Sequence, residues 1–358
     1  MRASAPGKPA RACWTWRCPD TFKRTHTMKT RPFQQVDVFT AVPYFGNPLA
    51  VVLNASGLDD EAMQRFARWT NLSETTFVQP PANPSADYRV RIFTPGGELP
   101  FAGHPTLGSC HSWLQAGGQP RNPDFIVQEC KIGLVKIRRE GARLAFAAPP
   151  LKRSAPSPAL LAQVAAALGV KAPQILAAQL LDNGPVWLGL LLDSPETVLQ
   201  LTPNHLELEK LDAKVGVAAV YQPEETPSLI ARANREAQAF VAPTLATACA
   251  ALPPEGAELA RGGPSLRSMA SMTASAEPDL EVRAFVASIG INEDPVTGSL
   301  NAGLAQWLIA EGHVPERYLA AQGVCLGRAG QVHIERDASG QVWVGGESVT
   351  CITGQVML

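Results

Sequence analysis

Short runs of alternating hydrophobic and polar residues predict β-strands in the first part of the chain. Residues 32–40 alternate in this way, and the turn residues Gly46-Asn47-Pro48 separate them from an apolar run over 49–53. Residues 88–93 predict another strand. Residues 61–70 instead carry apolar side chains at helical spacing, which predicts an amphipathic helix. This mixture of strands and helices predicts an α+β fold.

The pattern continues to a proline-rich stretch and then starts again. A helix is predicted over residues 102–116, where Gly117-Gly118 ends it. Residues 149–158 are rich in proline, which predicts a linker and a domain boundary. The strands predicted before the linker are 125–128, 134–138 and 143–147. The elements predicted after it are a helix over 159–168 and strands over 174–181 and 186–192.

Two segments repeat similar motifs in the same order. Val90-Arg91-Ile92-Phe93 resembles Val282-Arg283-Ala284-Phe285. Each is followed by a turn rich in glycine, proline or threonine that opens a helix. The first turn is Gly103-His104-Pro105-Thr106-Leu107-Gly108, and the second runs from Glu293 through Ser299. This repetition predicts two related halves.

The repeat and the linker divide the chain into expected units. We expect the N-terminal half over 28–150, the C-terminal half over 151–345, and a last strand over 346–358 that returns to the N-terminal half. Residues 224–278 are rich in alanine, proline and serine and lack clear strand patterning. We interpret them as an insertion at a junction between strands, which costs little loop-closure entropy.

The first 27 residues differ from the rest because they are basic and lack periodicity. Met28 directly precedes the first predicted strand. We interpret residues 1–27 as a disordered leader or a gene-start error, and we expect them to be dispensable. A transit peptide is the alternative.

Composition narrows the function classes. The 358 residues carry a net charge of −1, which argues against a general nucleic-acid or anionic-membrane binder. Hydrophobic residues make up 46% of the chain, yet no run is long enough to span a membrane. The seven cysteines are scattered and form no metal-binding cluster with histidine. Free thiols favour a cytoplasmic protein without a metal.

Two predicted helix starts are the main physical indication of a ligand site. A helix start presents unpaired backbone N–H groups and a partial positive charge, so two such starts at one cleft suit a substrate carboxylate. The candidate substrate-binding residues are Gly103, Pro105, Thr106, Gly298 and Ser299. The alternative is that both turns are ordinary helix caps.

Three titratable side chains are candidates for catalysis. Glu74 lies at the expected edge of a strand, where desolvation would raise its pKa and suit it to accept and return a proton. His104, beside a helix start, is a second acid/base candidate or a donor to the substrate. Asp294 either orients His104 and the substrate or caps its own helix through Thr297. The alternatives for Glu74 and His104 are a solvated surface carboxylate and a histidine that bonds its own loop.

Several ordered motifs resemble the PhzF-like phenazine biosynthesis isomerase family over about residues 31–356, apart from the insertion. The motifs are Asp37-Val38-Phe39-Thr40, Gly46 through Val52, Asn71-Leu72-Ser73-Glu74-Thr75, Arg91 through Pro95, Phe101 through Thr106, Gly290 through Ser299, and the tail from Gln322-Gly323 to Gly345-Gly346.

The resemblance implies the diaminopimelate-epimerase-like fold, with two pseudo-symmetric halves that are each a curved mixed sheet around a central helix. It implies that Glu74 is the catalytic acid/base and that His104, Asp294 and Ser299 are further active-site residues. It also implies a homodimer that moves a hydrogen within a small carboxylate substrate without a cofactor.

Racemases of this fold use two thiols at the two helix starts, and this chain has none there. Cys110 lies about two turns into its helix, so we do not expect two-cysteine chemistry. The main prediction is therefore a cofactor-independent isomerase. The alternatives are a non-catalytic protein that binds small carboxylates and a relative impaired by its insertion.

Overall fold

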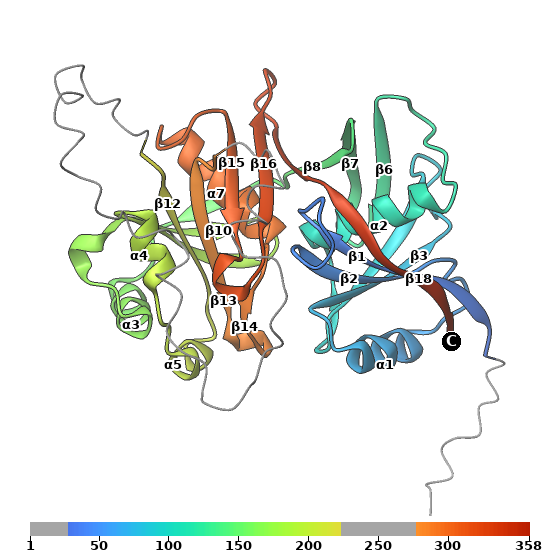
Figure 1. Ribbon diagram of the computed structural model, residues 1–358, viewed down its shortest axis with the longest axis horizontal. Coiled ribbons are helices and arrows are strands. Elements are labelled where there is room, and N and C mark those ends of the chain that lie inside the picture. The colour runs from blue at the N-terminus through green and yellow to red at the C-terminus, as the bar shows by residue number, and fades with distance from the viewer. Residues whose placement is uncertain (1–27, 223–276) are drawn as a thin grey trace, which may run out of the picture.

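The computed structural model describes residues 28–222 and 277–358, which form two halves side by side (Figure 1). The predicted leader lies outside these residues. The predicted insertion does so as well, except for its last two residues, 277 and 278.

The elements of the N-terminal half are β1 (Thr30–Val38), β2 (Asn47–Val52), α1 (Asp60–Thr70), β3 (Glu74–Gln79), β4 (Tyr88–Phe93), β5 (Glu98–Leu99), α2 (Gly103–Gln115), β6 (Phe125–Cys130), β7 (Gly133–Glu140) and β8 (Arg143–Ala147). Helix α1 begins where predicted because Asp59 caps it, accepting a 2.8 Å hydrogen bond from the Ala62 backbone N–H. Met63, Phe66 and Ala67 form its buried face.

The described elements after the N-terminal half are β9 (Lys152–Ser154), α3 (Pro158–Leu168), β10 (Ile175–Asp182), β11 (Val186–Leu192), α4 (Pro195–Gln200), α5 (His205–Lys210), β12 (Lys214–Val220), β13 (Leu280–Val286), β14 (Ile291–Asp294), α7 (Gly298–Ala310), β15 (Arg317–Gln322), β16 (Gly330–Arg336), β17 (Val342–Gly346) and β18 (Ser348–Met357).

Both halves pair their strands in the same order. In the N-terminal half, β2 is parallel to β3 and β4 is parallel to β6, whereas the other pairs from β1 to β8 are antiparallel. In the C-terminal half, β11 is parallel to β12 and β13 to β15, and the other pairs from β10 to β17 are antiparallel. Strands β1 to β8 thus correspond one to one to β10 to β17, which confirms the predicted α+β fold.

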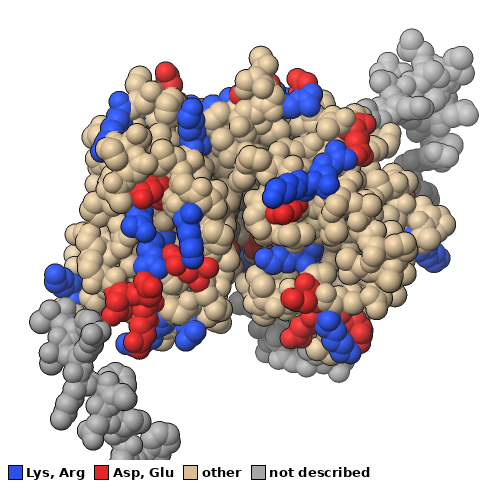
Figure 2. Space-filling model, turned by 180° about the vertical axis from the view of Figure 1, so that it is seen from behind, with Lys and Arg blue, Asp and Glu red and all other residues tan. Residues whose placement is uncertain are grey.

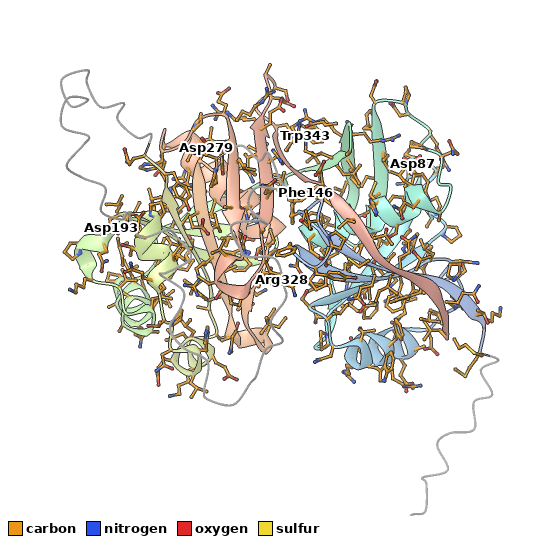
Figure 3. The ribbon with its side chains drawn as sticks, in the orientation of Figure 1. Asp87, Phe146, Asp193, Asp279, Arg328 and Trp343 are labelled. Atoms are coloured by element: carbon orange, nitrogen blue, oxygen red, sulfur yellow. The ribbon has the colours of Figure 1, made fainter. Side chains whose placement is uncertain are left out.

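Strand pairings between the halves join them into one continuous sheet. Strand β8 pairs with β17, which places Phe146 and Trp343 along this seam (Figure 3). Strand β9 pairs with β10, and β18 crosses back to pair with the whole of β1. Each first strand thus pairs with a strand that follows the other half, β1 along its whole length and β10 only over its last three residues.

The proline-rich stretch predicted as a linker contains regular structure. Lys152–Ser154 forms β9, in which Arg153 pairs with Leu181 of β10. The prediction missed this strand because its three residues are polar and exposed, and therefore carry no hydrophobic alternation.

Helices α2 and α7 lie at the centres of the two halves. Helix α2 packs against β1, β2, β3 and β8, and α7 packs against β10, β11, β16 and β17. One apolar cluster runs through both halves and includes Leu107 of α2 and Leu300 and Trp307 of α7. The two helices meet at their N-termini, where Gly103 lies against Gly298.

The surface carries charges of both signs. Figure 2 shows Lys and Arg interspersed with Asp and Glu over both halves, and a furrow between the halves. No helix within 28–222 or 277–358 is long and apolar enough to cross a membrane.

The contact between the two helix starts leads to a stability prediction. A Cβ atom on Gly298 would lie 2.8 Å from the Gly103 Cα atom, and this backbone cannot rotate away as a side chain can. We expect Gly298→Ala to lower the free energy of unfolding by about 1–3 kcal/mol, measured by urea denaturation. The matched control is Gly97→Ala, because a Cβ there meets no heavy atom within 4 Å. Equal effects of the two substitutions would contradict this account of the helix contact.

Candidate active site

Glu74 and His104 face each other where the two halves meet. Glu74 is the first residue of β3, just after α1, and His104 is the second residue of α2. The Glu74 Oε2 atom lies 3.5 Å from the His104 Nε2 atom, and the side chains are only 14% and 4% exposed. Within the described residues, both atoms are buried without a hydrogen-bond partner. A buried polar atom without a partner is costly, so this pair is suited to a ligand group.

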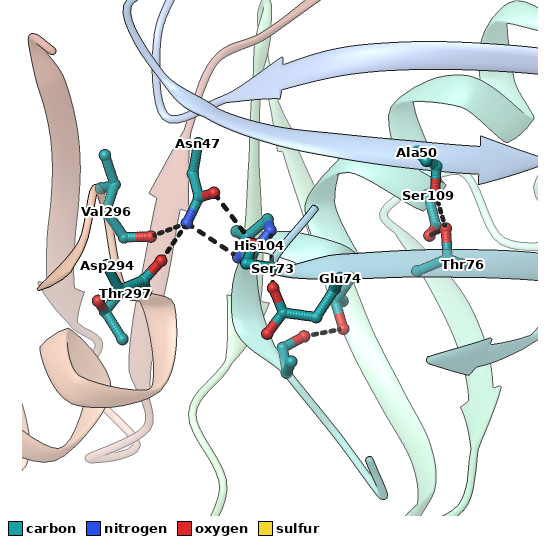
Figure 4. Close-up of polar contacts among 12 residues, drawn as sticks. Asn47, Ala50, Ser73, Glu74, Thr76, His104, Ser109, Asp294, Val296 and Thr297 are labelled. Atoms are coloured by element: carbon teal, nitrogen blue, oxygen red, sulfur yellow. Dashed lines mark hydrogen bonds and ion pairs between the residues drawn. The ribbon is translucent and has the colours of Figure 1, made fainter. Parts of the chain in front are cut away.

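Asn47 connects His104 to the C-terminal half (Figure 4). Its Nδ2 group donates to Asp294 Oδ1 at 2.8 Å and to the Val296 carbonyl oxygen at 2.9 Å, and it lies 3.3 Å from His104 Nδ1. The two N–H bonds of this amide serve the two shorter contacts, and an amide nitrogen does not accept, so a proton on His104 Nδ1 would have no acceptor in Asn47. The proton of a neutral His104 ring is therefore on Nε2, which faces Glu74.

Asp294 ends β14, and side chains from both halves bond to its carboxylate. Besides Asn47, its carboxylate accepts a 2.6 Å hydrogen bond from the Thr297 hydroxyl. Gln322 fixes the same turn, since its Nε2 donates to the Asp294 carbonyl oxygen and its Oε1 accepts from the Thr297 N–H. Thr297 is the N-cap of α7 but makes no side-chain cap. The Asp294 carboxylate thus bonds both Asn47 and the N-cap residue of α7, so its two predicted roles, orienting the site and supporting the helix start, are both compatible with its contacts.

Burial shifts the pKa values of all three titratable groups. It raises the pKa of Glu74 to about 7, against the opposing influence of Ser73 and the positive charge of Lys214. It lowers the pKa of His104 to about 4, although Asp294 favours the imidazolium. It also raises the pKa of Asp294, and the nearby Glu74 carboxylate adds to this shift. His104 is thus neutral at neutral pH, so its contact with Glu74 is not an ion pair.

The five candidate binding residues lie at the two helix starts but differ in what they offer. Gly103 and Gly298 lie against each other, and Pro105 is buried in the first turn of α2. The Thr106 N–H and hydroxyl both donate to the Ala102 carbonyl oxygen, so neither is free for a ligand. The Ser299 hydroxyl accepts a hydrogen bond from Trp187 at 3.2 Å.

Asn47, Gln322 and Lys214 were not predicted as site residues from the sequence. Asn47 was interpreted only as a turn residue of Gly46-Asn47-Pro48. The sequence signal for Asn47 was a polar residue just before the apolar run over 49–53, and the structure shows that Asn47 is completely buried and Gln322 is 1% exposed. Buried amides that make specific hydrogen bonds commonly fix the geometry of a site.

The described residues contain no group of three or more His, Cys, Asp or Glu side chains placed to hold a metal ion. Two surface cavities of about 470 and 440 Å³ are lined by other residues, the first beside α1 and β4 and the second over the β8–β17 seam.

The fold matches solved structures of PhzF proteins. A PhzF-family structure from Bacillus anthracis superimposes with a TM-score of 0.67 at 20% identity, covering 92% of this chain and all of that one. A protein of Mesorhizobium japonicum described as an uncharacterized isomerase is 32% identical over 92% of this chain and 100% of its own length. The fold and these relatives define an isomerase.

The family model of the PhzC-PhzF phenazine biosynthesis-like proteins matches residues 36–235 and 224–354. The chain belongs to this family. The trans-2,3-dihydro-3-hydroxyanthranilate isomerase of Pseudomonas aeruginosa is 36% identical over 176 residues, which are 48% of this chain and 61% of that enzyme.

Proposed function

We propose that this isomerase moves a proton between two carbon atoms of a small carboxylate-bearing metabolite, with Glu74 as the proton carrier and without a cofactor. The observation that supports the proposal is the pair of buried atoms, Glu74 Oε2 and His104 Nε2, which face each other without other partners. A substrate that contacts both atoms would meet a proton acceptor in Glu74 and a hydrogen-bond donor in His104.

A single side chain can carry out both proton transfers of this reaction. The Glu74 carboxylate takes a proton from one carbon of the substrate, and the resulting carboxylic acid returns a proton to a second carbon. The substrate thereby changes only the position of a hydrogen and a double bond. A pKa of about 7 suits both roles, because the two forms of Glu74 are then close in free energy at neutral pH.

His104 and Asp294 have positioning roles in this proposal. The neutral imidazole donates its Nε2–H toward the charge that develops on the substrate. Asn47 holds His104 Nδ1 and Asp294 together and keeps the donating nitrogen directed at Glu74. The name of the Pseudomonas aeruginosa relative implies the isomerisation of trans-2,3-dihydro-3-hydroxyanthranilate, a ring acid with amino and hydroxy substituents. This acid is therefore the first substrate to test.

Turnover tests the proposal directly. We expect the protein to isomerise trans-2,3-dihydro-3-hydroxyanthranilate or another member of a pool of small amino and hydroxy carboxylates. The reaction is monitored by ¹H NMR. If the proton carried by Glu74 exchanges with solvent during turnover, the product formed in D₂O should carry deuterium at the new C–H position. Failure to isomerise any member of the pool would count against this function.

The pH dependence of kcat/KM is a second test of the proposed reaction. Glu74 must be ionised to accept a proton, so kcat/KM should rise with pH around a midpoint near 7. The groups that face Glu74 are His104, Asp294 and Lys214. With a pKa of about 4, His104 stays neutral across this range, whereas Asp294 titrates together with Glu74. A profile that is flat between pH 5 and 9, or that falls through pH 7, would contradict Glu74 as the base.

A further inference from the structure

The strand registers relate Glu74 to a specific residue of the other half. In the N-terminal half, Phe93 of β4 is paired with Thr75, the residue after Glu74. In the C-terminal half, Phe285 of β13 is paired with Val215, the residue after Lys214. Because Phe93 and Phe285 end the repeated Val-Arg-x-Phe motif, Lys214 is the pseudo-symmetric counterpart of Glu74.

The same correspondence holds for the parallel neighbours and the central helices. Glu74 is paired with Leu49 on β2, and Lys214 is paired with Trp187 on β11. The helix starts Gly103-His104 and Gly298-Ser299 correspond in the same way. His104 lies beside Glu74, so Ser299 is the residue expected beside Lys214.

The contacts agree with this placement. The Trp187 indole donates its hydrogen bond to the Ser299 hydroxyl, so the strand neighbour of Lys214 contacts the start of α7. Lys214 is partly buried and is close enough to Glu74 for each charge to act on the other. Among the described residues its ammonium group makes no hydrogen bond and no ion pair within 4.0 Å, although Asp212 also acts on it electrostatically.

We propose that Lys214 binds the carboxylate group of the substrate, together with the first turn of α7, on the side of the junction opposite Glu74. This inference rests on the proposed function and assigns its two tasks to different halves. Glu74 and His104 of the N-terminal half move the proton, and Lys214 and Ser299 of the C-terminal half hold the anion. A partly buried ammonium group suits this task because a bound carboxylate supplies the counter-charge.

A pair of ligands that differ in the carboxylate tests the assignment. The probes are 3-hydroxyanthranilate, the aromatic counterpart of the acid named for the Pseudomonas relative, and 2-aminophenol, which has the same ring without the carboxylate. Benzoate and phenol, and butyrate and butanol, extend the comparison to other monocarboxylates. Affinities are measured by calorimetry for the wild type, Lys214→Met and Lys214→Arg.

We expect Lys214→Met to weaken carboxylate binding about 10- to 100-fold, as for the loss of a charge-assisted hydrogen bond, and to leave the carboxylate-free partners unchanged. Lys214→Arg should recover part of the affinity because it keeps the charge. The matched control is Lys210→Met, since Lys210 is an exposed lysine paired with Glu207 on α5. Melting temperatures show that each variant is folded.

Two outcomes would overturn the inference. One is a wild type that binds no carboxylate more tightly than its carboxylate-free partner. The other is a folded Lys214→Met variant that keeps the full preference. The Glu74→Gln variant separates this inference from the proposed function, because it should keep the carboxylate preference while losing turnover. Normal turnover in Glu74→Gln with lost preference in Lys214→Met would reject the proton carrier and retain the anion site.

Discussion

Replacing Glu74 by glutamine is expected to lower turnover by at least ~10²-fold, the typical loss when a general acid/base group is removed. The substitution preserves the shape of the side chain but removes the group that accepts and returns the proton. Substrate binding should change much less, because the proposed anion site lies on the other half. Steady-state kinetics and calorimetry on the same preparations measure the two effects.

A second buried glutamate provides a matched control. Burial also raises the pKa of Glu281 to about 7, and its carboxylate accepts a 2.9 Å hydrogen bond from the Tyr221 hydroxyl. Glu281 lies on β13 and has no contact with His104 or Asp294 among its described interactions. Glu281→Gln should therefore leave turnover within about twofold. Near-normal turnover in Glu74→Gln would move the search for the base to His104 and Asp294.

The sequence predicted the fold well where one residue pattern dominates. The strand over 88–93 and the helix after Asp59 agree with β4 and α1, because alternation and capping are local properties. Strand β9 was missed, and α4 and α5 were not predicted, since each has only three to six residues and too few turns to establish a period.

The site was predictable only in part. The repeat and the family resemblance selected Glu74, His104 and Asp294, and the structure places the first two 3.5 Å apart and links the second and third through Asn47. Their catalytic roles stay predictions. Lys214 carries no local motif. Its relation to Glu74 depends on the register of β12 against β13, which is a property of the folded sheet.

The repeated Val-Arg-x-Phe motif supports a second strong prediction, about stability. Arg283 forms a two-pronged ion pair with Glu293 at 2.8 and 2.9 Å, and the side chains are only 7% and 6% exposed. Its Nη1 also donates to the backbone carbonyl oxygens of Val198 and Leu201. Arg283→Met would leave a buried carboxylate and two carbonyl groups with fewer partners. We expect the free energy of unfolding to fall by about 3–5 kcal/mol, measured by urea denaturation.

Arg91 is the pseudo-symmetric control for Arg283. It forms the same two-pronged pair with Glu98, and its guanidinium group lies 5.1 Å from the Phe93 ring centre, against 5.0 Å for Arg283 and Phe285. The Arg91 pair is more exposed, at 15% and 22%, so water can solvate Glu98 once the arginine is lost. We therefore expect Arg91→Met to cost only about 1 kcal/mol.

Comparing the losses of unfolding free energy in Arg283→Met and Arg91→Met tests whether burial determines the cost of losing the arginine. The carbonyl oxygens of Val198 in α4 and of Leu201 at its C-terminal end accept hydrogen bonds from Arg283. The corresponding partner of Arg91 on α1 is the exposed carboxylate of Asp60. If Arg283→Met and Arg91→Met lowered the free energy of unfolding equally, the ion pairs that both arginines form would account for the whole loss. The hydrogen bonds of Arg283 to Val198 and Leu201 would then contribute nothing. A larger loss for Arg283→Met would show that burial determines the cost. Because Glu293 directly precedes Asp294, that variant should also displace Asp294 and lower turnover, whereas Arg91→Met should not.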